Sequence, residues 1–292
     1  MLHTLLYFLA LLSLSTSSIW AKLNQMPASV LGFWRLSLAS LMLGIYVYGF
    51  KKTPFPKLEK KMLWVILSGT FFFAHLWSYK YAAKHNLIAN MMILFATNPL
   101  WTTIGSVIFF KEKLSRRLWL AFFFAAFAVV ILVHKQFQFG GESMYGDLAA
   151  LASAFFFACY MLTGKGARAH YTNSVYASVQ YFTCALLFLL AASINQEIFT
   201  GYSEISWIAV AGQVILPTFL GHFISTYLMS HMKLSVMSCG KMIEPVIAAV
   251  LAFFLFHEAL TFEAIIAFIL TALSLLILFT PQIRNLKKEN SL

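Results

Sequence analysis

Long stretches without a single charged residue recur along the whole chain, as in residues 86–110, 174–196 and 205–230. At a helical rise of 1.5 Å per residue, each stretch is long enough to cross the ~30 Å hydrocarbon core of a bilayer. Only 11% of all residues are charged, whereas an ordinary soluble domain carries roughly 25%. The sequence therefore excludes a soluble domain and predicts a multi-pass membrane protein.

The spans are predicted to be helices. Membrane β-barrels show segments of about ten residues with alternating polarity, whereas these stretches are continuously apolar. Reading between charged or turn-rich breaks predicts ten spans, at residues 3–21, 30–50, 62–80, 86–110, 118–133, 147–165, 174–195, 205–230, 234–256 and 263–280. The first span lacks a preceding Lys or Arg and a clear cleavage site, so we interpret it as retained and not as a secretory signal.

The basic residues indicate the topology. A formal net charge of +11 could suggest a nucleic-acid partner, but the Lys and Arg residues follow the positive-inside rule. With a cytoplasmic N-terminus, four fall on the outside (Lys22, Lys80, Lys84 and Lys135), two within spans (Arg35 and Lys241) and the other fifteen inside. We therefore predict cytoplasmic N- and C-termini and no nucleic-acid partner.

The sequence also contains an internal repeat. A shift of 146 residues places Tyr81 on Tyr227, Pro99 on Pro245 and Glu112 on Glu258, and it aligns NPLWTTIGSVIFFKEKLS with EPVIAAVLAFFLFHEALT. We predict a first repeat at 1–137, a second at 138–283 and a basic cytoplasmic tail at 284–292.

The two repeats are predicted to be inverted, because each holds five spans, an odd number. Loop charge tests this independently. Residues 51–61 hold five lysines, whereas their repeat partners at 197–207 hold two glutamates and no Lys or Arg. The same reversal relates 111–117, with four basic residues, to 257–263, with none. Inverted repeats favour alternating access around one central site.

The repeated Pro, followed thirteen residues later by Glu and then by Leu-Ser or Ala-Leu-Thr, resembles the EamA domain of the drug/metabolite transporter superfamily. The segment PASVLGFWRLSLASLML resembles the family's second helix, with Arg35 in the place of its Arg. The resemblance implies secondary transport through a central cavity, usually in a bacterial inner membrane. It does not imply one substrate, and Lys241 departs from the apolar or small residue that such sequences more often carry.

Charged residues within a span are costly, about 2.5–3.5 kcal/mol each on insertion scales. Lys241 and Glu244 are three residues apart on one helix and lie near the middle of the ninth span, beside Pro245. Because proline has no N–H to donate, the backbone carbonyl of Lys241 is expected to be free at this point. Lys241 could attract a carboxylate or phosphate, and Glu244 could bind an amine or a coupling proton. An ion pair that only fixes helix packing is the alternative interpretation.

Further candidates are weaker. Asn98 is the repeat partner of Glu244 and could line the cavity or hold a kinked helix, and His222 and Gln213 accompany Pro217 in the eighth span, where helix packing is the competing explanation. His75, Trp77 and Tyr160 are aromatic candidates for substrate contact. Arg35 could extend to the membrane surface or bind a helix end or an anionic group, and a structural role is favoured. Glu112 and Glu258 are expected to terminate helices or to form salt bridges between repeats.

Enzyme chemistry has little support in the sequence. His257-Glu258 lacks the second histidine of a zinc-protease motif, there is no phosphate-binding Walker loop, and the three cysteines have no metal-ligand spacing. We expect no cofactor, no metal and no catalytic residue. The predicted function is gradient-driven transport of a small polar metabolite, with an amino-acid-like zwitterion slightly preferred. The alternatives are a carrier of nucleotide-like or phosphorylated metabolites, a passive channel and a membrane-embedded enzyme.

Overall fold

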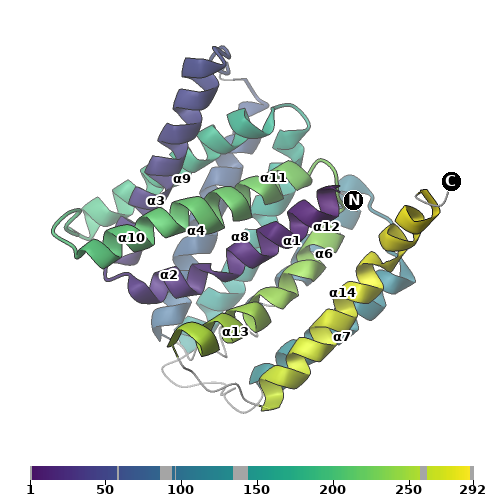
Figure 1. Cartoon of the computed structure of the whole chain (residues 1–292). Helices are drawn as coiled ribbons and strands as arrows, with labels where there is room; N and C mark the ends of the chain where they lie inside the picture. Colours follow the sequence, from purple (N-terminus) through teal and green to yellow (C-terminus); the bar gives the residue numbers. More distant parts are fainter. Residues whose placement is uncertain are drawn as a thin grey trace.

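The computed structural model describes residues 2–57, 59–85, 94–95, 97–133, 144–256 and 262–289. These residues are almost entirely helical and contain no strand (Figure 1). The repeat boundary predicted at 137/138, Lys135, and the motif residues His257 and Glu258 lie outside the described residues. The predicted tail begins within the last helix, which continues to Glu289.

In its described residues, each predicted span contains one helix or a broken series of helices, and the helix of span 86–110 is α6. The elements are α1 (Leu2–Ser15), α2 (Ser17–Leu23), α3 (Ala28–Gly44), η1 (Ile45–Phe50), α4 (Met62–His85), α6 (Asn98–Phe110), α7 (Arg116–Val133), α8 (Met144–Arg168), α9 (Asn173–Ile194), α10 (Glu204–Gln213), η3 (Val214–Phe223), α11 (Ile224–Leu228), α12 (Leu234–Gly240), η4 (Lys241–Ile243), α13 (Glu244–Phe256) and α14 (Phe262–Glu289). Within the described ranges, six helical segments are long and apolar enough to cross a membrane. The count of ten spans therefore remains a prediction.

Helix pairing follows the repeat. The 146-residue shift converts α4 into the α10–η3–α11 series, α8 into α1, and α6 into α13. Accordingly, α4 packs against α8 just as η3 packs against α1, and α6 packs against α8 just as α13 packs against α1. The same shift converts α3 into α9 and α7 into α14, and the two members of each pair pack against each other. The pair of α7 and α14 runs along one side of the molecule in Figure 1. Two halves related by a two-fold axis are expected to pack through such equivalent pairs of helices.

The repeat also preserves a local side-chain arrangement. The Tyr81 and His85 rings stack at 4.1 Å, and the equivalent Tyr227 and His231 rings lie 4.5 Å apart. In both copies the His Nδ1 lies 3.0 Å from the carbonyl oxygen of the Tyr. Residues that the shift aligns therefore adopt the same geometry, in support of a duplication.

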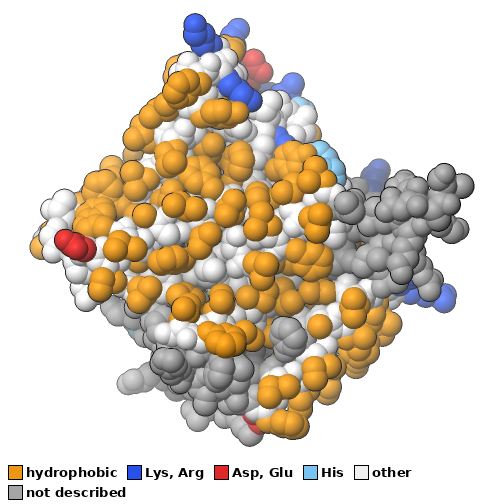
Figure 2. Space-filling model, in the orientation of Figure 1, with side chains coloured by type: hydrophobic (Ala, Val, Ile, Leu, Met, Phe, Trp, Pro, Cys, Tyr) orange, Lys and Arg blue, Asp and Glu red, His pale blue; other side chains and the backbone are white. Residues whose placement is uncertain are grey.

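The outer surface is hydrophobic. Large apolar side chains are exposed along α1, α6, α7, α9 and α14, and Figure 2 shows such side chains over most of one face, with Lys and Arg at its upper tip. An apolar surface of this extent would be unstable in water and suits contact with lipid.

Close packing between spans depends on glycine, and Gly69 gives a testable example. A Cβ atom at this position of α4 would lie 2.8 Å from both the carbonyl oxygen of Gln180 and the Cβ of Thr183 on α9. Because the carbonyl belongs to the backbone, Gly69→Ala should force the helices apart and lower stability by about 1–3 kcal/mol. The measurement is the thermal unfolding midpoint of the purified protein in detergent.

Gly44→Ala is the matched control, because a Cβ there would meet nothing within 4 Å. Alanine in a helix is more favourable than glycine by about 0.5–1 kcal/mol, so this variant should melt at the same temperature as the parent or above it. Equal melting of the two variants would contradict the close contact of α4 with α9.

Candidate functional site

A cavity of about 160 Å³ lies between the two halves of the chain. Six of the eight residues proposed from the sequence line it: His75, Asn98, Gln213, His222, Lys241 and Glu244. These side chains come from α4, α6, α10, η3, η4 and α13, so the cavity is assembled from elements of both repeats.

The break at Pro217 supplies one wall of the cavity. Proline has no backbone N–H, so the helix cannot make its usual bond to the carbonyl four residues earlier, at Gln213. The Thr218 hydroxyl donates to that carbonyl instead, at 2.7 Å, and Val214–Phe223 adopts π-helical geometry. π-Helical turns of this kind are frequent at functional sites. The rearrangement places the Thr218 oxygen where Arg35 Nε donates to it, at 2.7 Å.

The break before Pro245 supplies another part of the cavity wall. The span divides into α12, the short 3₁₀ turn Lys241–Ile243 and α13. We expected the proline to leave the Lys241 carbonyl free, but the Glu244 N–H donates to it within this turn. The α-helix is therefore interrupted at the two charged side chains without leaving that carbonyl unpaired.

Lys241 and Glu244 form an ion pair with 2.7 Å between Nζ and Oε1, although the contact lacks the alignment of a hydrogen bond. The Lys241 ammonium also lies 4.7 Å from the centre of the Phe157 ring, a cation–π arrangement. Both charged side chains are largely buried, with 9% and 20% of their surface exposed. The charge of Lys241 is thus compensated by its neighbour, and both side chains line the cavity.

Asn98 occupies the repeat-related position at the start of α6, with Pro99 next to it in the first turn. Its Nδ2 donates to the carbonyl of Phe95 at 3.0 Å. Its Oδ1 is buried and accepts no hydrogen bond from the described residues. The amide oxygen is therefore available to a donor on a bound solute.

The two histidines differ in their surroundings. His75 Nδ1 lies 2.9 Å from Ser153 Oγ, and the Ser153 hydroxyl donates to the His75 carbonyl at 3.1 Å. The His222 ring packs edge-on against Phe72, with 4.7 Å between ring centroids. Both rings are buried and line the cavity.

Tyr160 and Trp77 lie away from this cavity. Tyr160 is buried and lines a second, much smaller cavity of about 10 Å³ beside His222 and Lys241. Trp77 packs near Phe73 and Phe188 and lines neither cavity.

Two basic residues of the cavity were not among the site residues predicted from the sequence. A structural role was favoured for Arg35 over the binding of an anionic group, and Lys80 was assigned to an outer loop, yet both line the cavity. Lys80 is in the last part of α4, and its Nζ donates to the carbonyl of Ala28 at 2.7 Å. For Arg35, the sequence indicated a place in the cavity only through the position of this residue inside an otherwise uncharged span.

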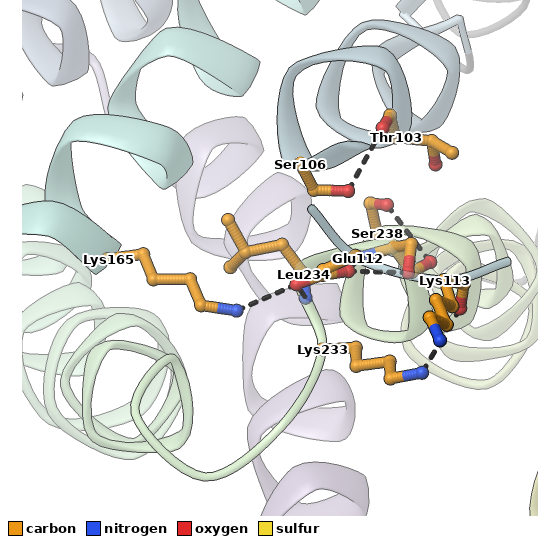
Figure 3. Close-up of polar contacts among 9 residues, drawn as sticks. Thr103, Ser106, Glu112, Lys113, Lys165, Lys233, Leu234 and Ser238 are labelled. Atoms are coloured by element: carbon orange, nitrogen blue, oxygen red, sulfur yellow. Dashed lines mark hydrogen bonds and ion pairs between the residues drawn. The ribbon is translucent and has the colours of Figure 1, made fainter. Parts of the chain in front are cut away.

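A separate polar cluster joins the halves near the ends of α6, α8 and α12 (Figure 3). Figure 3 shows Lys165 extending toward Glu112, and the Lys165 Nζ to Glu112 Oε1 distance is 2.7 Å. Glu112 also accepts from the Leu234 N–H at 3.0 Å and the Ser235 hydroxyl at 2.8 Å. The carboxylate therefore caps the first turn of α12, a favourable place for negative charge, and forms the salt bridge between repeats considered from the sequence.

These contacts set the protonation of Glu112. Partial burial raises the pKa of its carboxyl, but the hydrogen bonds from Lys165, Leu234 and Ser235 outweigh burial and hold the pKa below its ordinary value. Glu112 is therefore charged at neutral pH.

Comparison with known proteins identifies the fold and a family. The model of the EamA-like transporter family matches residues 1–134 and again 144–280. Among 29 matching chains of solved structures, one described only as a crystal structure of a protein has a TM-score of 0.81 and 21% sequence identity, over 94% of this chain and 95% of that chain. No curated protein matches the sequence. The similar structure shows the fold, and the two family matches coincide with the two halves.

Proposed function

This chain belongs to the EamA-like transporter family, and from that membership we propose that it is a gradient-driven secondary transporter or exchanger. It is a multi-pass membrane protein of the drug/metabolite transporter type. The proposed setting is a bacterial inner membrane with both termini in the cytoplasm. The observation that carries the proposal is the cavity between the repeats, which is lined by charged side chains in an otherwise apolar protein.

The proposed substrate is a small polar metabolite, with an amino-acid-like zwitterion preferred. Positive and negative side chains both line the cavity, and buried charges of both signs are suited to a solute that carries both. The cavity volume of about 160 Å³ is close to that of a ~150 Å³ engineered cavity that holds benzene. That size favours a compact solute over the alternative substrate class of nucleotide-like or phosphorylated metabolites.

Alternating access is the proposed mechanism. On the topology inferred from charge, the cavity residues of α3, α4 and α10 lie in the outer halves of their spans. Glu112, Lys165 and Leu234 lie at the cytoplasmic ends, where they bind one another. In this arrangement the site is closed toward the cytoplasm. It would open there if these contacts broke and the repeat-related contacts on the opposite side formed in their place.

The test of a carrier is counterflow in proteoliposomes. Liposomes loaded with a metabolite extract should take up labelled solute in a saturable manner and faster than empty liposomes. Linear, unsaturated conductance would indicate a channel instead, and product formation without flux would indicate an enzyme. Mass spectrometry of metabolites gained or lost by expressing cells supplies the candidate solutes.

A further inference from the structure

We propose that Arg35 is the anion-binding group of the cavity, and that the transported solute therefore carries a carboxylate. This inference rests on the proposed transport function and assigns to Arg35 the role for which the sequence alone favoured Lys241. It depends on the hydrogen bonds of the guanidinium, on the charges that surround it and on its place in the cavity.

The guanidinium is fixed on one side and unpaired on the other. Nε donates to Thr218 Oγ1 at 2.7 Å, and Nη1 makes a long contact of 3.4 Å with Gln213 Oε1. Nη2 is buried and has no hydrogen-bond partner among the described residues. The whole residue is 4% exposed and lines the cavity. A buried, charged donor without a partner is energetically unfavourable. A ligand that accepts a hydrogen bond from Nη2 would remove this cost, and its binding would therefore be favoured.

The charge balance points to the same class of ligand. Among the described residues that line the cavity, Arg35, Lys80 and Lys241 are basic and Glu244 is acidic. Lys241 is already paired with Glu244. In the described part of the chain, neither Arg35 nor Lys80 forms an ion pair, and the Lys80 ammonium donates only to the carbonyl of Ala28. The cavity thus holds an excess of buried positive charge, and a bound anion would compensate it.

The geometry of arginine favours a carboxylate. Its planar, rigid arrangement of N–H groups matches the two oxygens of a carboxylate, whereas lysine acts as a point charge. Thr218 sets the plane of the guanidinium through Nε, so the direction of Nη2 is determined before the ligand binds. An amine on the same solute would find Glu244, which also lines the cavity.

The experiment compares small acids with their amides, which have nearly the same shape but no carboxylate. Glycine, L-alanine, L-serine and propionate are each tested beside the corresponding amide, through the thermal unfolding midpoint of the purified protein and counterflow in proteoliposomes. The parent protein should be stabilised by at least one acid and not by its amide. Arg35→Gln should weaken binding of that acid by about 30-fold or more, the loss expected for truncating one partner of a buried charge pair.

Arg168→Gln is the matched control. Arg168 is also partly buried and donates to the carbonyl of Thr226 at 3.2 Å, but it lies outside the cavity. This variant should retain the preference for the acid. If Arg35→Gln does not purify as a folded protein, Arg35→Lys keeps the charge and should keep the preference with weaker binding.

The outcomes separate the two proposals. Equal binding of acid and amide by the parent, no binding of any acid in the panel, or an affinity for the acid in the folded Arg35 variant that equals the parent's would overturn the anion site. Saturable counterflow of extract solutes together with any of these results would leave the transporter intact. Absence of counterflow for every solute would overturn transport itself.

Discussion

Replacing Glu244 with Gln should abolish gradient-driven accumulation while leaving the protein folded. A proton that crosses 100 mV supplies about 2.3 kcal/mol, enough for about 40-fold accumulation of a neutral solute. Gln cannot take up that proton but has nearly the same shape, so the variant should only equilibrate its solute. The measurement is the ratio of internal to external labelled solute in proteoliposomes over a series of imposed pH gradients.

Other titratable groups near the cavity make a control necessary. Lys241 pairs with Glu244 directly, and the described cavity lining also includes His75, His222, Tyr79, Lys80 and Arg35. His222→Gln and His75→Gln retain the carboxylate and should retain a pH-dependent ratio. Glu204→Gln changes an exposed carboxylate in the first turn of α10 and should behave as the parent. An unchanged pH dependence in Glu244→Gln would exclude Glu244 as the coupling group.

Replacing Glu112 with Ala should open the closed end of the protein and destabilise it. The change removes the salt bridge to Lys165 and the bonds from Leu234 and Ser235. Because the Lys165 ammonium and the first turn of α12 lose their shared acceptor, the expected cost is about 3 kcal/mol.

Cys239 can report the opening. Its side chain is 2% exposed and packs with Leu118 and Ala121 of α7, near the end of α12. The test uses a Cys159→Ser background and a membrane-permeant maleimide. The rate at which the maleimide labels Cys239 should rise by about tenfold or more in Glu112→Ala. A shift of about 1.4 kcal/mol in the opening equilibrium would give a tenfold rise. Glu59→Gln, which changes an exposed carboxylate, should not alter labelling. Unchanged labelling and melting in Glu112→Ala would exclude the proposed role in closure.

The contribution of Glu112 to the stability of the folded protein should also decrease as the pH falls. Its pKa is lower in the folded protein than its ordinary value, so its contribution to stability is complete above the ordinary carboxyl pKa. That contribution disappears as the pH falls through the lowered value. The difference in melting temperature between the parent and Glu112→Gln should therefore be largest at neutral pH and should vanish in acid. A difference that grows in acid would contradict this assignment.

Much of the fold could be predicted because the relevant signals are local. A span is an uninterrupted apolar stretch of sufficient length, and the reversal of loop charge could be read without knowing any contact between helices. The helices of the structure coincide with the predicted spans, although the described residues do not establish all ten as membrane spans. Pro217 and Pro245 likewise marked the breaks, since a missing N–H interrupts the hydrogen bonding of a helix beyond its first turn.

The site was harder to predict because it depends on distances between spans. Lys241 and Glu244 could be paired from their spacing on one helix, but the freedom of the Lys241 carbonyl was misjudged because the 3₁₀ turn supplied another donor. Trp77 was proposed as readily as His75, yet only His75 lines the cavity. A span gives no indication of which of its faces meets the other repeat.

The sequence by itself determined that this chain crosses a membrane, that it is duplicated and that equivalent loops of its two repeats differ in charge. Hydrophobic length and charge are properties of the chain alone. Only the tertiary structure decided which polar groups share the cavity. The Arg35–Thr218 bond joins residues 183 positions apart and exists because a proline-dependent rearrangement in one span faces an arginine in another. Whether a buried charge is paired or available depends on that packing.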